Sequence, residues 1–315
     1  MEKETIAVLI PAYNEEKTIA QVMMDFSLAC PEAKLYVINN NSSDDTQNII
    51  YKTIKNSKLN AEYLFESKQG KGAAVRTAFR IISEDIIVLV DADLTYQADD
   101  LQMMVSVFRQ TKADMLIGDR LTQGKYKEQN KRLFHNFGNS LVKNIINYLY
   151  NSNINDIMTG YRIISGKFKN HYSVAYNGFQ LETDITIHAL DKNLKIVEVP
   201  IQYLDRPIGS ESKLSTYKDG VKVILAIINL FRYYRPMTFF SYISLLLVLC
   251  SLISGFLPIK DYFNNGYVHH VPLAILASSF AVLSMLTFIA GTILDAIARY
   301  NRVSFDRSWN NANHR

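Results

Sequence analysis

Two aspartates follow directly on an apolar run, in the segment Asp91-Ala92-Asp93 after residues 86–90 (IIVLV). A buried strand that ends in two carboxylates delivers them to the carboxyl edge of a sheet, where α/β proteins bind ligands. Two hard oxygen donors at that edge suit Mg²⁺ or Mn²⁺ holding a diphosphate. The spacing alone is a weak signal, because such a pair is also common at a helix N-cap or in a solvated turn.

Further polar segments follow the other apolar runs: 11–16 (PAYNEE), 39–45 (NNNSSDD), 70–72 (GKG) and 118–120 (GDR). The Gly-Lys-Gly turn offers flexible backbone and a cation, which fits a phosphate. Loops at the carboxyl ends of parallel strands emerge at one edge of the sheet. We therefore expect these segments to build one pocket.

The elements that must position these loops alternate along the chain. We expect strands over 5–11, 34–38, 61–65, 86–90, 113–118 and 196–203, and helices over 15–29, 98–109, 135–150 and 182–191, with two more after Asp45 and Gly70. Strands that alternate with helices predict an α/β fold with a doubly wound, mostly parallel sheet.

Composition limits the function classes. The 315 residues are 48% hydrophobic and 20% charged, which permits a large core and argues against wholesale disorder. The net charge of +4 and the absence of a basic-aromatic pattern argue against nucleic acid as a partner. The two cysteines form no disulfide framework, and the N-terminus does not read as a signal peptide.

Two uncharged stretches, 237–257 and 271–294, are each long enough to span a bilayer core of about 30 Å. The alternative is a pair of buried core helices. Arginines flank the pair at 232, 235, 299, 302 and 307, so the positive-inside rule predicts that both flanks and the N-terminal domain lie in the cytoplasm. We expect a multi-pass protein of the inner (cytoplasmic) membrane, with both termini cytoplasmic.

The expected organisation is a catalytic domain over 1–216, a juxtamembrane amphipathic helix over 217–235, a two-helix transmembrane anchor over 236–298 and a cytoplasmic tail over 299–315. The amphipathic segment suits a helix lying in the membrane interface. An ordinary helix that packs on the domain is the alternative for this segment.

Taken in order, the five polar segments, followed by Asp205-Arg206 and Ser212-Lys213, resemble glycosyltransferase family 2. The resemblance covers residues 5 to about 235 and is strongest to the polyprenyl- or dolichyl-phosphate sugar synthases. It implies a GT-A fold, a nucleotide-sugar donor, a divalent metal (Mg²⁺ or Mn²⁺) and inversion at the anomeric carbon. The implied acceptor is polyprenyl phosphate, such as undecaprenyl phosphate.

The resemblance also implies roles for individual residues. Positions that match donor-nucleotide contacts are Pro11, Ala12, Tyr13, Glu15, Ile38, Asn40, Lys71, Asp91, Ala92 and Arg120. The implied metal site is Asp91, Asp93 and Thr95. The implied catalytic residues are Asp93, Asp156 and Arg206. The residues implied to bind the acceptor phosphate are Arg206, Lys213 and Arg162.

Two departures from the family pattern leave alternatives open. Asn39-Asn40-Asn41-Ser42 stands where Asp-Asp-Gly-Ser is usual; Asn40 can still bond a base or ribose, but it brings an amide donor, so base preference stays open. Thr95 stands where some relatives have Gln, and it is a weaker ligand that works through water. Three roles stay open for Asp156: it serves as a base, it orients Arg162, or it caps a turn.

Glu182 and Asp184 read first as acids at a helix N-terminus, and a role in the active site is the alternative. The alternative function is a non-processive enzyme that extends a lipid-linked or cell-wall glycan. Processive relatives usually carry Gln-x-x-Arg-Trp, and the single tryptophan, Trp309, lacks that pattern. A catalytically inactive subunit that regulates a membrane complex is disfavoured because both Asp-x-Asp carboxylates are present. UDP-glucose, UDP-N-acetylglucosamine and GDP-mannose remain as donors for cell-envelope glycan modification, and a homo-oligomer remains possible.

Overall fold

The computed structural model describes residues 4–122, 133–174, 181–204, 228–229 and 231–311. Contacts divide the chain into two compact units. The first comprises Met1–Val223 together with Ser308–Arg315, and the second comprises Ile224–Arg307.

The first unit contains a seven-stranded sheet with the order β3-β2-β1-β4-β6-β5-β7. β6 runs antiparallel to both of its neighbours, and every other pair is parallel. This arrangement confirms the predicted GT-A-like, mostly parallel α/β sheet. The strands are β1 (Ile6–Ala12), β2 (Lys34–Asn39), β3 (Ala61–Phe65), β4 (Ile86–Leu89), β5 (Met115–Asp119), β6 (Arg162–Ser165) and β7 (Ile196–Pro200).

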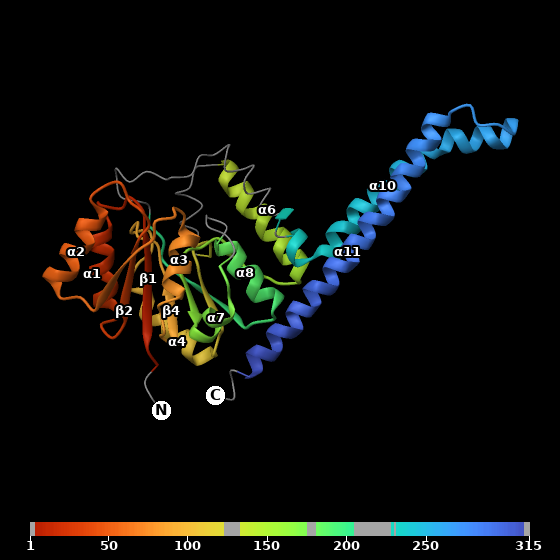
Figure 1. Ribbon diagram of the computed structural model, residues 1–315. Coiled ribbons are helices and arrows are strands. Elements are labelled where there is room, and N and C mark those ends of the chain that lie inside the picture. The colour runs from red at the N-terminus through yellow and green to blue at the C-terminus, as the bar shows by residue number, and fades with distance from the viewer. Residues whose placement is uncertain (1–3, 123–132, 175–180, 205–227, 230, 312–315) are drawn as a thin grey trace. The chain divides into compact units, whose positions relative to one another are not determined.

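Helices connect these strands (Figure 1). They are α1 (Ile19–Ala29), α2 (Thr46–Ser57), α3 (Lys71–Phe79), α4 (Asp100–Thr111), α6 (Leu133–Tyr150), α7 (Gly166–His171) and α8 (Leu181–Asp191). α1 and α4 bury their apolar faces in one core cluster, together with the residues of β1 that point to that face. α3 contacts β1 and β2 but adds nothing to this cluster, so it covers the other face of the sheet.

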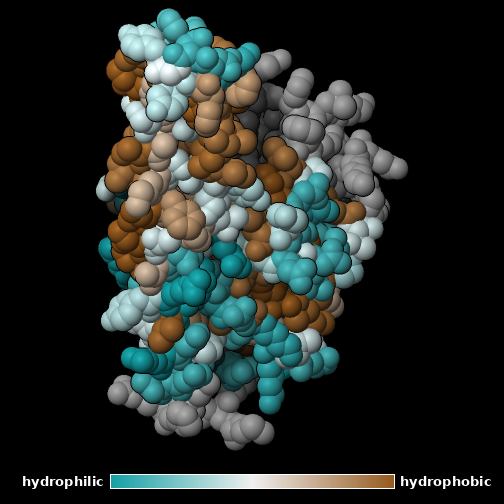
Figure 2. All heavy atoms as spheres, turned by 90° about the vertical axis from the view of Figure 1, so that its right-hand side faces the viewer, coloured by the Kyte–Doolittle hydropathy of each residue, from teal (hydrophilic) through white to brown (hydrophobic). Residues whose placement is uncertain are grey.

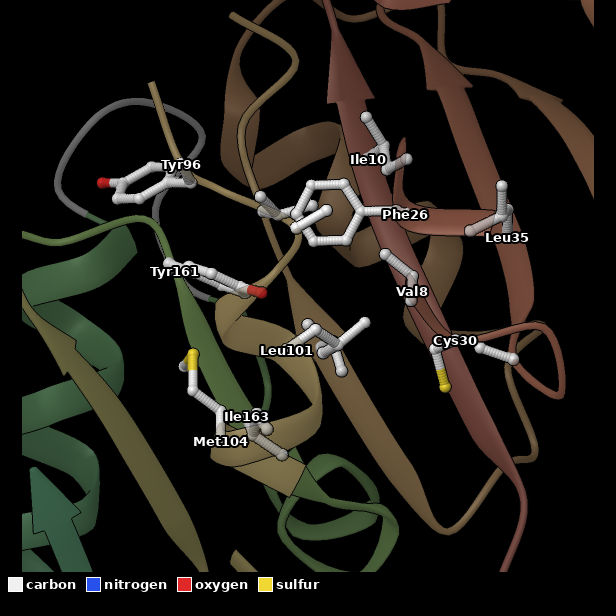
Figure 3. Packing of buried hydrophobic residues seen from close by; sticks show 14 of the residues in the cluster. Val8, Ile10, Phe26, Cys30, Leu35, Tyr96, Leu101, Met104, Tyr161 and Ile163 are labelled. Carbon is white, nitrogen blue, oxygen red and sulfur yellow. The ribbon is translucent and has the colours of Figure 1, made fainter. Parts of the chain in front are cut away.

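Aromatic side chains extend this core toward the carboxyl edge of the sheet. Phe26 of α1 meets Tyr161 edge-on, with ring centroids 5.8 Å apart, and Tyr161 lies 5.5 Å from Tyr96 (Figure 3). Tyr96 follows β4 and Tyr161 precedes β6, so the core fixes two loops that emerge near the Asp91-Ala92-Asp93 segment. Aromatic pairs of this kind add about 0.5–1.5 kcal/mol beyond the area they bury.

The sequence did not predict β6 or α7. β6 has only four residues and pairs with β4 and β5, which are distant in sequence, so no local pattern marks it. The last strand was predicted too long: β7 ends at Pro200, and Tyr203 forms an isolated bridge with Tyr96 instead.

The second unit is a helical hairpin built from α10 (Pro236–Asn265) and α11 (Val271–Asn311). Both helices are long and apolar enough to cross a membrane. Only 17% and 11% of their most apolar windows are buried, which contradicts the alternative of buried core helices. Hydrophobic side chains accordingly gather on the surface in the space-filling view (Figure 2).

Polar and small side chains hold the two helices of the hairpin together. Ser244 and Ser284 each donate to the other's backbone carbonyl at 3.1 Å, and Gly255 brings α10 against Ala277. In hydrocarbon, such contacts replace the hydrophobic driving force between helices. The predicted tail is helical through Asn311, whereas most of the predicted amphipathic helix lies outside the described residues.

Candidate active site

The predicted site residues gather where the strand order reverses. β2 and β3 lie on one side of β1, and β4 lies on the other, so the loops after β1 and β4 diverge at this switch point. The loop after β1 is fastened to the loop after β2, because Asn14 N–H donates to Ser42 Oγ at 3.0 Å and Glu15 N–H donates to Thr46 Oγ1 at 2.8 Å. These bonds fix the two loops to each other.

The two carboxylates after β4 have different surroundings. The Asp91 side chain is 29% exposed, whereas Asp93 is almost fully buried. The backbone N–H and hydroxyl of Thr95 both donate to Asp93 Oδ1, at 3.2 and 2.6 Å. Thr95 is itself buried. Thr95 therefore orients the Asp93 carboxylate, and its role as a metal ligand stays a prediction.

Lys71 is the first residue of α3 and points its ammonium at two acids. It donates to Asp91 Oδ1 and, at 2.5 Å, to Glu182 Oε1. Gly70, at φ +126°, supplies the turn before it, a conformation that favours glycine. Burial alone would lower the pKa of Lys71, but the charges of Asp91 and Glu182 outweigh it and hold that pKa above its usual range. Lys71 is therefore a fixed cation beside the carboxylates.

Gly160 lets this cluster form. A methyl group on its Cα would overlap Asp91 Oδ2 and come within 3.0 Å of Lys71 Nζ. The Gly160 N–H donates to the Tyr96 hydroxyl at 2.7 Å, which holds the backbone in place. The glycine thus gives Asp91 and Lys71 the space that a side chain would fill.

Asp91 and Asp93 fit a hard divalent cation. Mg²⁺ and its analogues are usually held by one or two carboxylates, with substrate phosphates and waters as the remaining ligands. Within the described residues no group of three or more His, Cys, Asp or Glu side chains could hold a metal ion. A site of two carboxylates completed by a diphosphate agrees with both facts.

Asn40 has a different role from the predicted contact to a base or ribose. Its amide nitrogen donates to the carbonyls of Glu66 and Lys68, at 3.3 and 2.7 Å, and its oxygen accepts from Gly70 N–H at 2.6 Å. The residue is only 3% exposed. Asn40 therefore holds the loop that leads into Lys71.

Asp156 pairs with an arginine other than the Arg162 named among its alternatives, and its role as a base stays a prediction. Both of its oxygens accept from the Arg120 guanidinium, at 2.7 and 2.9 Å, and it is buried. Arg120 in turn reaches the Tyr96 hydroxyl at 3.4 Å. Glu198 of β7 accepts the backbone N–H of Asp156 at 3.0 Å, and burial raises the pKa of Glu198. Asp156 is therefore placed to orient Arg120.

Arg162 is not available to an acceptor phosphate, contrary to the prediction. It is 1% exposed and bonds to the carbonyls of Thr159 and Ile157 and, at 2.7 Å, to Thr186 Oγ1. Burial lowers its pKa. The buried guanidinium connects the start of β6 to α8 through its hydrogen bond to Thr186.

The remaining predicted donor contacts differ in exposure. The side chains of Ala12, Ile38 and Ala92 are buried in or beside the strands, so their predicted contacts would use backbone atoms. Pro11, Tyr13 and Glu15 are half-buried, and the Tyr13 hydroxyl accepts from Gln69 at 3.2 Å. The predicted acceptor residues Arg206 and Lys213 lie outside the described residues, and their roles remain predictions.

Two side chains that matter here, Tyr96 and Glu198, were not singled out in the sequence. Tyr96 lies three residues beyond Asp93, a proximity that could have signalled it. Glu182 was read first as a helix N-terminal acid, with an active-site role as the alternative. Glu198 lies within a strand pattern and gives no local signal, because its partners at 155 and 156 come from a distant loop.

Comparisons with known proteins agree with this geometry. The family model "Glycosyl transferase family 2" matches residues 7–169, about half of the chain. Glycosyltransferase AglJ of Haloferax volcanii is 24% identical over 305 residues, covering 96% of this chain and 97% of that protein. The undecaprenyl-phosphate mannosyltransferase of Micrococcus luteus is 27% identical over 238 residues, covering 72% and 93%.

The solved structure of glucosyl-3-phosphoglycerate synthase from Mycobacterium tuberculosis, in complex with Mn²⁺ and UDP, superposes with a TM-score of 0.56 at 20% identity. It covers 72% of this chain and 79% of that chain, and the likeness supports the fold. The family match includes β1, the Asp91-Ala92-Asp93 segment, Arg120 and Asp156. The chain therefore belongs to glycosyl transferase family 2 and is a glycosyltransferase.

Proposed function

We propose that this enzyme transfers a hexose, with inversion, from a nucleotide sugar to a polyprenyl phosphate such as undecaprenyl phosphate. UDP-glucose, UDP-N-acetylglucosamine and GDP-mannose are the candidate donors. The product is a polyprenyl-monophosphate sugar for modification of cell-envelope glycans. The observation that carries the proposal is Lys71 held between Asp91 and Glu182 at the switch point of a chain that also bears an apolar hairpin.

Similar proteins support the lipid acceptor. The Micrococcus luteus relative is named an undecaprenyl-phosphate mannosyltransferase, and a Mycolicibacterium smegmatis relative, 25% identical over 218 residues, is named a polyprenol monophosphomannose synthase. An apolar hairpin suits an enzyme whose acceptor resides in a membrane.

The donor side of the site suits a leaving nucleoside diphosphate, which gains negative charge in the transition state. Asp91 and Asp93 would hold Mg²⁺ or Mn²⁺, and the bound cation supplies charge stabilisation to the diphosphate. Lys71 adds a positive charge beside Asp91. Arg120 adds a second, oriented by Asp156. Preorganised charges of this kind stabilise developing charge at little reorganisation cost.

The pairing of Asp156 with Arg120 supports a phosphate as the acceptor. A sugar hydroxyl that attacks needs a base, yet both oxygens of Asp156 already accept from Arg120. A phosphate monoester is largely ionised near neutral pH and needs no base. Its oxygen attacks the anomeric carbon, the bond from that carbon to the diphosphate oxygen breaks, and its electron pair leaves with the nucleoside diphosphate. No proton has to move.

We further propose that the hairpin anchors the enzyme in the cytoplasmic membrane, with the catalytic domain and both termini in the cytoplasm. The positive-inside bias supports this orientation. The segment 217–235 is proposed to lie in the interface, where Arg206 and Lys213, just before it, would hold phosphate at headgroup depth.

The test uses purified full-length protein with each radiolabelled donor and undecaprenyl phosphate. Transfer of label to the organic phase, as an acid-labile monophosphate sugar, is the expected result. Label that enters only a pre-formed lipid-linked glycan would favour the alternative, non-processive glycan extension. Absence of transfer from all three donors to the lipid phosphate would contradict the proposal.

A further inference from the structure

Glu182 and Asp91 hold the same ammonium from opposite parts of the chain. Glu182 lies in the first turn of α8, 111 residues after Lys71, and Asp91 follows β4. The side chains of Lys71 and Glu182 are 15% and 10% exposed, whereas Asp91 is 29% exposed. Of the two acids, Glu182 is the more enclosed and Asp91 is the more exposed to solvent.

The Lys71–Asp91 contact bears on cation binding. Lys71 donates to Asp91 Oδ1, and only the absence of a side chain at Gly160 leaves space beside Oδ2. An ammonium and a divalent cation cannot both occupy one carboxylate oxygen, and their charges repel each other. Given that Asp91 is a metal ligand, as the proposed function requires, Lys71 and the cation compete for it.

We propose that Glu182 is a positioning residue that keeps Lys71 at the carboxyl edge of the sheet while Lys71 exchanges Asp91 for the donor diphosphate. The inference rests on the proposed function. An ammonium has three N–H donors. Two of these N–H groups donate to Asp91 and Glu182. Lys71 can therefore retain its hydrogen bond to Glu182 and redirect the N–H group that had donated to Asp91 toward a phosphate oxygen. The binding of cation and diphosphate would thereby be coupled through one side chain.

The experiment measures Mn²⁺ binding to the metal-stripped full-length protein by electron paramagnetic resonance, first with Mn²⁺ alone. Lys71→Met should bind Mn²⁺ more tightly, on the order of tenfold, because the competing cation is gone. Glu182→Gln should bind it more weakly, since Lys71 then pairs with Asp91 alone. Lys68→Met is the matched control, an exposed lysine of the same loop, and should leave Mn²⁺ affinity unchanged.

A double variant shows whether Glu182 affects Mn²⁺ binding through Lys71 or directly through its own negative charge. If Glu182 acts through Lys71, Glu182→Gln should have no effect on Mn²⁺ affinity in a Lys71→Met background. An equal loss in both backgrounds would overturn the positioning role. Unchanged or weaker Mn²⁺ binding by Lys71→Met would overturn the competition. Thermal melting curves of each variant would reveal any loss of fold.

Addition of UDP or GDP completes the test. The nucleotide should strengthen Mn²⁺ binding in the wild type, and this gain should shrink in Lys71→Met and in Glu182→Gln. An undiminished gain in both variants would overturn the exchange of Lys71 onto the diphosphate. Failure of transfer to lipid phosphate, with the Mn²⁺ pattern intact, would refute the proposed acceptor alone. A wild type that bound no Mn²⁺ would refute the metal site and this inference together.

Discussion

At the scale of single residues, Asp93 and Thr95 act as a pair. Because Thr95 donates twice to Asp93 Oδ1, it fixes which way the carboxylate faces. Asp93→Asn should remove most of the metal-dependent transfer while the fold survives, since one charge of the cation site is lost. Thr95→Val should lower the rate of sugar transfer roughly tenfold, because the backbone N–H still donates to Asp93 and only the hydrogen bond from the hydroxyl is lost. Sugar transfer over a series of Mn²⁺ concentrations is the measurement.

The conservative variant Thr95→Ser keeps the hydroxyl and serves as the control; it should stay close to wild type. Thr95→Val should recover partly as Mn²⁺ is raised, whereas Asp93→Asn should not. Full turnover of the wild type in excess EDTA would show that these carboxylates do not act through a metal.

Asn40 shows how a departure from a family pattern can be explained by its neighbours. Its amide faces two carbonyls and one N–H of the loop 66–70. Asn40→Asp could still accept from Gly70 but would place a carboxylate against the carbonyls of Glu66 and Lys68. The loss should be about 1–3 kcal/mol of stability, together with weaker nucleotide binding as the loop before Lys71 loosens.

Asn41→Asp is the matched control for that change. Asn41 is exposed, has φ +58° and donates only to Ser67 O at 3.1 Å, and aspartate tolerates this backbone conformation. Calorimetry with UDP and GDP on both variants separates the two positions. Equal losses at 40 and 41 would mean that the buried network around Asn40 has no special role.

At the scale of elements, α8 carries both a residue of the site, Glu182, and a buried histidine, His188, whose pKa is shifted. Glu182 opens this helix and His188 lies near its end, stacked edge-on against Phe168 and Tyr172 at 5.6 and 5.0 Å. Burial, with smaller contributions from Lys192 and His171, lowers the pKa of His188 to about 4. An unfolded histidine titrates near pH 6.5, so the folded state resists a proton that the unfolded state accepts.

The stability contributed by neutral His188 is therefore present above about pH 6.5 and is lost as the pH falls toward about 4. The loss is at most about 3 kcal/mol. His188→Phe should lessen this acid destabilisation, because phenylalanine cannot take a proton. Thermal melts of detergent-solubilised protein between pH 7 and 4.5 provide the measurement. Identical pH dependence in wild type and variant would assign the acid sensitivity to other groups.

The same scale explains what the sequence could and could not reveal. Loops after β1, β2, β4 and β5 could be located because an apolar run followed by polar residues is a local pattern. The pairing of Arg120 with Asp156 could not, since it depends on where antiparallel β6 inserts between β4 and β5. Arg162 was misassigned for a related reason: the sequence shows a cation after Gly160-Tyr161, but only packing shows that it is buried.

At the scale of the whole molecule, the arginines that flank the hairpin determine a testable orientation. They lie before α10 and in the last part of α11, whereas the connection at 266–270 carries no lysine or arginine. In the proposed orientation, which keeps the positive charge in the cytoplasm, the connection lies outside and the catalytic domain inside. The hydrogen bonds between Ser244 and Ser284 hold α10 and α11 as a pair, so both helices should cross together.

Single cysteines test this orientation in intact cells, in a Cys30→Ala/Cys250→Ala background. Asn265→Cys, exposed beside the connection, should react with a membrane-impermeant maleimide added outside. Asn56→Cys, exposed on α2, should react only after the membrane is opened. The reverse pattern would invert the topology. Labelling of both sites from outside would place the connection and the catalytic domain on the same side, so the hairpin would not cross the membrane as proposed, and the domain would not face cytoplasmic nucleotide sugars.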